Sequence, residues 1–216
     1  MLITTQREQN EFVGRLAERW RAENPQDPEA IHAFSHAMTD DLDTLWGLSV
    51  TLGRPFLGAG IDCLLVYEKV AGIIACGYTA RFLGVKSMIG AERLSQSYHS
   101  SEWASSQINA ARYYEGYVRA GIKKNPLLEG KRVLVMDDII DGGGTVMGLL
   151  NIAAALKLNV IGIASLVAKH AGLEAIRSNH KNAPLPYTTL KPRIVTLVEI
   201  IDNNTLISDL YEIQKA

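Results

Sequence analysis

The feature that most constrains the fold is an alternation of short apolar runs with helical patterns, which begins near residue 61. Apolar runs with the length of buried strands occur at 63–67, 85–90, 132–136, 160–168 and 193–200. Helical patterns occupy the segments 72–83, 106–120, 145–157 and 171–179. Alternation of this kind predicts right-handed crossovers between parallel strands. We therefore predict an α/β fold, in which a mostly parallel, twisted sheet carries helices on both faces.

The first 52 residues have a different pattern and are predicted to form a helical N-terminal cap. Phe12, Leu16 and Trp20 recur every four residues, which is the spacing of one helix face. Residues 1–50 contain nine Asp or Glu and four Arg but no Lys, so this segment is acidic. We therefore divide the chain into a cap, residues 1–52, and an α/β domain, residues 53–216.

Composition narrows the expected partners and location. The 216 residues carry a net charge of −1, and this near-neutral balance argues against a nucleic-acid partner. The two cysteines, Cys63 and Cys76, both lie in apolar stretches, which fits a reducing compartment and predicts a cytoplasmic protein. The apolar runs of the sequence are shorter than a membrane span, so we expect no membrane partner.

The stretch VLVMDDIIDGGGTV, residues 133–146, joins a predicted buried strand to a helix through a glycine-rich turn. Gly142, Gly143 and Gly144 allow a tight turn whose N–H groups face one point. The N-terminus of the following helix adds its dipole, and the whole arrangement favours a phosphate group. Thr145 could cap that helix and donate its hydroxyl to the same anion.

Two adjacent carboxylates, Asp137 and Asp138, precede this turn. They would repel a phosphate unless they face another part of the ligand. Sugar hydroxyls suit them, because a carboxylate can accept hydrogen bonds from a diol directly or bind it through a divalent cation. The residues therefore predict a sugar-phosphate ligand, with its phosphate in the glycine turn and its diol on the aspartates.

The same stretch resembles the signature of type I phosphoribosyltransferases that binds 5-phosphoribosyl 1-diphosphate (PRPP). That signature has four apolar residues, two acidic residues, two apolar residues and a variable residue, usually followed by Thr-Gly-Gly-Thr. Gly142 stands where the first Thr of that pattern usually lies. The resemblance implies the family fold over about residues 60–200, a Mg²⁺ cofactor and a homodimer. It also implies transfer of ribose 5-phosphate from PRPP to a nitrogenous base, with release of diphosphate.

The resemblance assigns roles to the residues of the signature. Asp137 and Asp138 would hold the ribose hydroxyls, directly or through Mg²⁺, and Asp141 would assist proton transfer at the base. The turn from Gly142 to Thr145 would bind the 5′-phosphate. A second loop, after the strand at 63–67, would bind the diphosphate. Its residues are Glu68, Lys69, Val70, Ala71 and Gly72. An ordinary turn between a strand and a helix is the alternative reading of that loop.

A polar segment, residues 91–105, would be the family's lid, which closes over the reacting centre and excludes water. Its candidate residues are Arg93, Ser97, Tyr98 and His99. The Ser97-Tyr98 pair resembles the Ser-Tyr pair in the closing loop of hypoxanthine-guanine enzymes. A solvated surface loop is the alternative reading of this segment.

The segment IGIASLVAKHAG, residues 161–172, resembles the strand of purine enzymes in which a lysine meets the exocyclic oxygen of the base. Lys169 would be that base-binding residue, and an exposed lysine at a strand end is the alternative. We therefore favour a purine as the acceptor. An orotate enzyme is the second reading, because the basic segment 117–133 faintly resembles the basic loop of those enzymes. A non-catalytic regulator that senses PRPP is the third.

Overall fold

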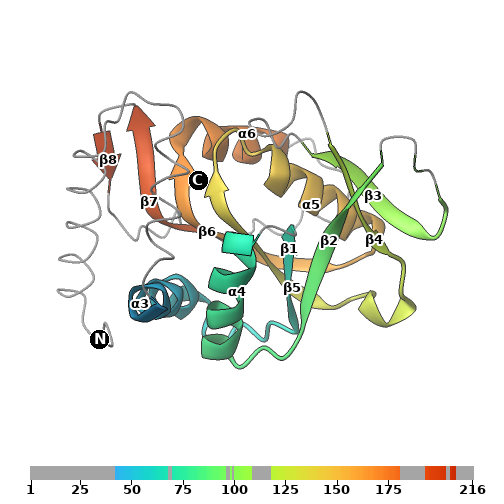
Figure 1. Ribbon diagram of the computed structural model, residues 1–216, viewed down its shortest axis with the longest axis horizontal. Coiled ribbons are helices and arrows are strands. Elements are labelled where there is room, and N and C mark those ends of the chain that lie inside the picture. The colour runs from blue at the N-terminus through green and yellow to red at the C-terminus, as the bar shows by residue number, and fades with distance from the viewer. Residues whose placement is uncertain are drawn as a thin grey trace.

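The protein, described by a computed structural model, is built around one twisted sheet (Figure 1). The structure describes residues 42–67, 70–95, 98, 100–108, 118–180, 193–202 and 205–207. Within these residues the sheet has eight strands, in the order β3-β4-β2-β1-β5-β6-β7-β8. The strands are β1 (Cys63–Tyr67), β2 (Met88–Leu94), β3 (Trp103–Ile108), β4 (Val118–Lys123), β5 (Arg132–Ile140), β6 (Asn159–Lys169), β7 (Arg193–Asp202) and β8 (Thr205–Ile207).

The centre of the sheet is parallel, and its two sides are antiparallel. Strands β2, β1, β5, β6 and β7 pair in parallel. Strand β4 runs antiparallel to both β2 and β3, and β8 runs antiparallel to β7. The predicted α/β fold with a mostly parallel sheet is therefore confirmed. Because parallel strands end at the same side, β1, β2, β5, β6 and β7 share one carboxyl edge, where ligands of such sheets bind.

Helices cover both faces of the sheet (Figure 1). They are α3 (Leu42–Gly53), α4 (Val70–Leu83), α5 (Gly144–Ala155) and α6 (His170–His180), with short 3₁₀ turns η1 (Arg54–Phe56) and η2 (Pro126–Leu128). Residues of α5 and α6 share one buried cluster with β5, and residues of α3 and α4 share a second cluster with the same strand. Strand β5 therefore reads as a nearly continuous apolar run, as a strand covered on both faces must.

The helix predicted over residues 106–120 is wrong at both of its ends. Strand β3 ends at Ile108 and β4 begins at Val118, while residues 109–117 lie outside the described part of the chain. In β4, the alternate residues Val118, Ala120 and Ile122 are buried, which is the period of two that a half-buried strand shows. The pairing of β4 with β2 and β3 decides this structure, and that pairing is not local in sequence.

Strand boundaries also differ from prediction around the proposed lid. The strand expected at 85–90 lies instead at Met88–Leu94, and residues 103–105 belong to β3. The segment expected to be a polar loop over 91–105 is thereby shortened to 95–102. The strand β8 was not predicted. In the described part of the chain, no helix is both long and apolar enough to cross a membrane.

The described part of the predicted cap is helix α3, which packs into the same core as the sheet. Leu45, Leu48 and Leu52 are at most 1% exposed and belong to the cluster that includes β5 and α4. Two buried hydroxyls, of Ser49 and Thr79, join α3 to α4 by hydrogen bonds to backbone carbonyls. Residues 1–41 lie outside the described residues, so the division into a cap and an α/β domain stays a prediction.

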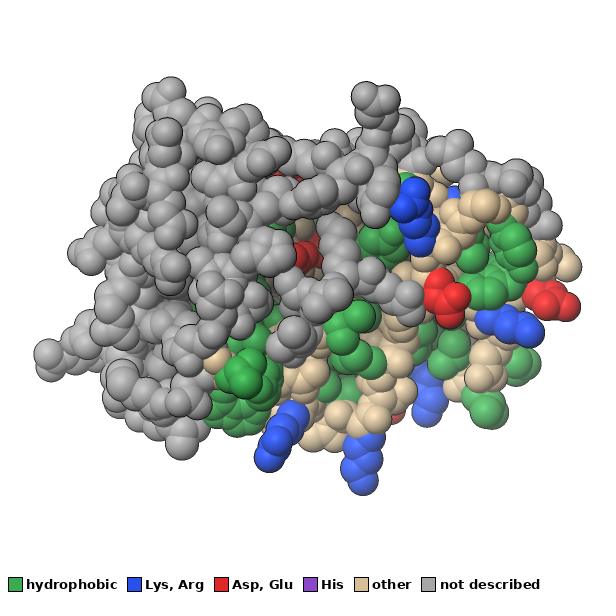
Figure 2. Space-filling view, in the orientation of Figure 1, with side chains coloured by type: hydrophobic (Ala, Val, Ile, Leu, Met, Phe, Trp, Pro, Cys, Tyr) green, Lys and Arg blue, Asp and Glu red, His purple; other side chains and the backbone are tan. Residues whose placement is uncertain are grey.

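On the side that carries β3 and β4, acidic and basic side chains lie next to one another at the surface (Figure 2). One ion pair there joins Lys123 Nζ to Glu102 Oε2 over 3.8 Å, with both side chains 69% exposed. Exposed pairs of this kind contribute about 0–1 kcal/mol. Strand pairing and packing against α5 therefore hold this part of the sheet, rather than its surface charges.

Candidate active site

The two adjacent aspartates lie inside β5, close to the carboxyl edge of the sheet. We expected the strand to end at residue 136, but β5 continues to Ile140. The reason is the neighbouring strand β6, whose ladder with β5 extends to the pair Ile140–Ala168. Asp137 and Asp138 are consequently 7% and 8% exposed, which is unusual for carboxylates.

The environment of these carboxylates suits a ligand that supplies hydroxyls or positive charge. The Asp138 N–H donates to Asp137 Oδ1 over 3.1 Å. Among the described residues, the buried Asp138 Oδ1 has no hydrogen-bond partner. A buried carboxylate oxygen without a partner costs free energy, so a ligand that satisfies it gains affinity. The described residues contain no cluster of three metal-ligating side chains. Two carboxylates suit Mg²⁺, which commonly uses one or two of them and takes its other ligands from substrate and water.

Helix α4 places a neutral thiol near the same carboxylates. Cys76 is 1% exposed, and its pKa is raised by burial and further by the charges of Asp137 and Asp138. A raised pKa keeps the thiol protonated at neutral pH, so it adds no third negative charge. Cys76 is therefore packing that borders the acidic pair.

The glycine turn leads directly into the N-terminus of helix α5. Gly143 is the residue before α5 and adopts φ +77°, which favours glycine. A Cβ on Gly143 would lie 2.9 Å from the carbonyl oxygen of Gly172 in α6, so space forbids a side chain as well. At Gly142, by contrast, a Cβ would meet nothing within 4 Å.

The expected capping role of Thr145 is wrong. The residue before α5 is Gly143, which provides no side-chain cap, and Thr145 lies one residue inside the helix, 7% exposed. The left-handed turn at Gly143 brings the chain into α5 earlier than a cap at Thr145 would. Gly144 is the first residue of α5. The N–H groups of the first helical turn, which have no partner within the helix, therefore lie at the glycine turn.

The structure brings together two residues that we assigned separately to the base. Lys169 is the last residue of β6, and its Nζ lies 2.5 Å from Asp141 Oδ1. Both side chains are 31% exposed. The pair therefore offers a donor and an acceptor side by side next to the glycine turn. Parallel pairing of β5 and β6 explains the contact, since both strands end at the carboxyl edge.

The predicted diphosphate loop is shorter than expected. Helix α4 begins at Val70, so Val70, Ala71 and Gly72 are helical rather than loop residues. Glu68 and Lys69 lie outside the described residues. The preceding strand β1 pairs with β5, so this connection leaves the sheet at the carboxyl edge, beside the aspartates. The diphosphate role of all five residues stays a prediction.

The lid residues are only partly described. Arg93 lies in β2, where it pairs in register with Ala120 of β4, so its expected position in a loop is wrong. Tyr98 is 39% exposed and makes an edge-to-face contact with Trp103, with ring centroids 5.9 Å apart. Ser97 and His99 lie outside the described residues. Strand β2 ends at the carboxyl edge, which is where a lid over the site must start.

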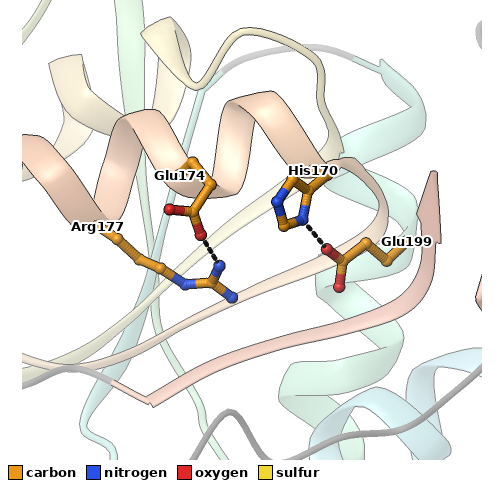
Figure 3. A network of polar contacts seen from close by, with 4 residues as sticks. All are labelled: His170, Glu174, Arg177 and Glu199. Atoms are coloured by element: carbon orange, nitrogen blue, oxygen red, sulfur yellow. Dashed lines mark hydrogen bonds and ion pairs between the residues drawn. The ribbon is translucent and has the colours of Figure 1, made fainter. Parts of the chain in front are cut away.

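One pair near the site escaped the sequence reasoning. His170, the first residue of α6, contacts Glu199 of β7, with 2.7 Å between Nδ1 and Oε1 (Figure 3). The available signal was its position directly after Lys169, but its partner is 29 residues away and only the sheet brings it near.

Comparison with known proteins shows which proteins this chain resembles. The family model described as "Phosphoribosyl transferase domain" matches residues 70–188, more than half of the chain. An orotate phosphoribosyltransferase from Thermoanaerobacter sp. (strain X514) is 31% identical over 57% of this chain and 53% of its own length. A xanthine phosphoribosyltransferase from Lactobacillus acidophilus is 27% identical over 54% of this chain and 59% of its own. The chain thus spans little more than half the length of these relatives.

A solved structure shares the fold. It is an adenine phosphoribosyltransferase from Trypanosoma brucei in complex with AMP, pyrophosphate and ribose-5-phosphate, with a TM-score of 0.56. The identity is 18%, over 75% of this chain and 67% of that chain. The match of the family model over the glycine turn, both aspartates and Lys169 agrees with this likeness. The chain therefore belongs to the phosphoribosyl transferase domain family.

Proposed function

We propose that the protein is a phosphoribosyltransferase, which transfers ribose 5-phosphate from PRPP to a ring nitrogen of a purine that carries an exocyclic oxygen. In this reaction the bond from the anomeric carbon to diphosphate breaks, a carbon–nitrogen bond to the base forms, and the base nitrogen loses its proton. The observation that carries the proposal is that three groups lie along the carboxyl edge of the sheet. They are a buried acidic pair, the N-terminus of α5 and the Lys169–Asp141 pair.

The acidic pair would bind the ribose. The unpartnered Asp138 Oδ1 supports a hydroxyl donor or a cation at this point. Asp137 and Asp138 would hold Mg²⁺ together with substrate oxygens, and the ion, when bound, stabilises the departing diphosphate. The ribose carbon gains positive charge as diphosphate leaves, and two nearby carboxylates favour that charge.

The glycine turn would bind the 5′-phosphate. The N–H groups at the start of α5 point out of the helix, and the helix dipole favours a dianion there. The close approach of α6 at Gly143 holds this turn in place before the ligand arrives. A turn that is already ordered loses less entropy on binding.

The Lys169–Asp141 pair would select and activate the base. A lysine ammonium donates hydrogen bonds and cannot accept them, so it pairs with an exocyclic oxygen and leaves an exocyclic amino group without a partner. Asp141 beside it would accept the proton that the base nitrogen releases. This favours hypoxanthine, guanine or xanthine over adenine. The connection between β2 and β3, the remaining part of the proposed lid, would exclude water from the activated sugar.

A panel of bases tests the proposal. Hypoxanthine, guanine, xanthine, adenine and orotate are each mixed with PRPP and Mg²⁺, and diphosphate release is measured. We expect turnover with the oxopurines and at least about tenfold lower kcat/KM with adenine, which lacks the oxygen that would accept a hydrogen bond from the Lys169 ammonium. Preference for adenine or orotate would contradict the base assignment. Binding of PRPP without turnover of any base would favour a PRPP sensor instead.

The variant with both Asp137→Asn and Asp138→Asn is the control for the ribose site. We expect it to keep the fold and to lose PRPP-dependent turnover, because amides cannot replace two charged carboxylates. Undiminished turnover in that folded variant would show that the ribose site does not lie on β5. A homodimer and a cytoplasmic location remain part of the proposal, and light scattering of the purified protein tests the first.

A further inference from the structure

The junction between β6 and α6 contains no loop. Lys169 is the last residue of the strand, and His170 is the first residue of the helix. From these two neighbours, side chains reach in different directions: Lys169 to Asp141 after β5, and His170 to Glu199 in β7. Whatever holds the backbone at His170 therefore also sets the starting point of the Lys169 side chain.

The contact between His170 and Glu199 ties the start of α6 to the neighbouring strand. Glu199 pairs in register with Ala168, two residues before His170. Its carboxylate is 19% exposed and lies 2.7 Å from the ring nitrogen, a short, partly buried hydrogen bond to a charged group. An ionised carboxylate only accepts, so Nδ1 carries the proton in this contact. Figure 3 shows the ring of His170 turned toward Glu199, across the space between α6 and β7.

The first turn of α6 also contacts the glycine turn, which would bind the 5′-phosphate. A Cβ on Gly172 would overlap the carbonyl oxygen of Asp141, and the carbonyl oxygen of Gly172 lies where a Cβ on Gly143 would have to fit. The start of α6 is thus packed against the residue that pairs with Lys169 and against the turn before α5.

We propose that His170 and Glu199 form a positioning pair, which holds the start of α6 and thereby keeps Lys169 at the base end of the site. The inference rests on the proposed function, since it concerns how the base-binding lysine is held. A lysine side chain has four rotatable bonds, so its ammonium stays near Asp141 only while its backbone is fixed. The pair acts through Lys169 and does not touch the substrate.

The same helix provides a matched control. Arg177 and Glu174 form an ion pair three residues apart within α6, which joins the helix to itself (Figure 3). Replacing Glu174 by Ala removes a carboxylate from α6 without releasing its first residue from β7. Replacing Glu199 by Ala removes a carboxylate and does release it.

Steady-state kinetics compare these two variants. We expect Glu199→Ala to raise the KM for the base by about tenfold, the effect of one charge-assisted hydrogen bond, and the KM for PRPP by less, because the packing of Gly172 on Gly143 does not use the Glu199 carboxylate. Glu174→Ala should leave both constants unchanged. Equal effects of Glu199→Ala on both substrates would show a general structural role and overturn the proposal. His170→Ala, which removes the other partner of the contact, replaces Glu199→Ala if the latter does not fold.

A double-mutant cycle shows whether the effect passes through Lys169. In a Lys169→Met background, Glu199→Ala should have no further effect on the KM for the base, because the positioned group is gone. Additive effects would overturn the proposal. His170→Asn, whose amide can donate from near the position of Nδ1, should restore part of the base affinity that His170→Ala loses.

A measurement without substrate separates this inference from the proposed function. Lysines are labelled by reductive ¹³C-methylation, and the Lys169 signal is identified by its absence in Lys169→Arg. We expect Glu199→Ala to move that signal in the same direction as Asp141→Asn does, and Glu174→Ala to leave it in place. An unmoved signal in Glu199→Ala overturns the positioning role, even if no base is turned over. A moved signal with no turnover of any base would leave the positioning intact and reject the proposed function.

Discussion

At the scale of single residues, two adjacent glycines of the same turn have opposite constraints. Gly143 combines a positive φ with a carbonyl oxygen that leaves no room for a Cβ. Gly142 has open space around it and a φ outside the left-handed region. Packing therefore does not require glycine at position 142, where the chain departs from the family pattern, whereas the backbone conformation and the packing both require it at position 143.

We predict that Gly142→Thr is tolerated and strengthens PRPP binding, while Gly143→Ala damages both stability and binding. A threonine hydroxyl next to the phosphate adds a hydrogen bond worth about 1 kcal/mol, or about fivefold in Kd. Alanine at φ +77° costs about 1–2 kcal/mol before the clash with α6 is counted. Titration calorimetry with PRPP and urea unfolding measure the two effects. An unchanged Kd in Gly142→Thr would mean that the hydroxyl has no role here.

At the scale of elements, β3 packs against α5, the helix that begins at the glycine turn. Gly148 makes this close approach possible, because a Cβ there would lie 2.5 Å from Ile108 Cγ1 and 3.1 Å from the carbonyl oxygen of Gln107. Ile108 is fully buried. Asn151 of α5 also donates to Ser106 Oγ over 3.3 Å. The strand that follows the proposed lid is thus anchored on the helix that would bind the 5′-phosphate.

We predict that Gly148→Ala lowers the free energy of unfolding by about 1–3 kcal/mol, because the added methyl group overpacks the contact between β3 and α5. Gly77→Ala is the matched control in α4, where a Cβ would meet nothing within 4 Å. There we expect a gain of about 0.5–1 kcal/mol from the better helix propensity of alanine. Urea unfolding of both variants checks the contrast, and a neutral Gly148→Ala would argue against the packing of β3 on α5.

At the scale of the whole molecule, the proposed ligand would contact the ends of several strands and the start of one helix. Each of these elements also contributes buried residues to the core. Strands β5 and β6 and helix α5 contribute residues to both the core and the site. A ligand bound to all of them is expected to stabilise the fold as a unit rather than one loop.

We predict that PRPP with Mg²⁺, at about one hundred times its Kd, stabilises the protein by about 3 kcal/mol and raises Tm by roughly 5–10 °C. Chelation of the metal should remove most of this shift, because the acidic pair then repels the diphosphate end of PRPP. The Asp137→Asn and Asp138→Asn double variant should show little shift at the same concentrations. Differential scanning calorimetry measures these values, and a full shift in the double variant would place the ligand elsewhere.

Much of the central sheet could be predicted from local pattern. The runs at 63–67, 132–136 and 160–168 are almost wholly buried and form β1, β5 and β6, although β5 extends beyond the predicted end. The glycine turn could also be predicted, since three consecutive glycines before an apolar helical pattern indicate a tight turn into a helix. The β3–β4 pair could not be predicted from the sequence. These strands form because they pair with each other and with β2 across long connections, and their local hydrophobic pattern does not show it.

The sequence by itself determined the fold class and the family, and it predicted the chemistry of the glycine turn and the acidic pair, because these depend on residues that are close together along the chain. Only the tertiary structure decided that Lys169 meets Asp141 and that His170 meets Glu199. These partners are nearly thirty residues apart, and they meet because β5, β6 and β7 run parallel and end at one edge. The order of strands in a sheet follows from packing of the whole chain, which local patterns do not encode.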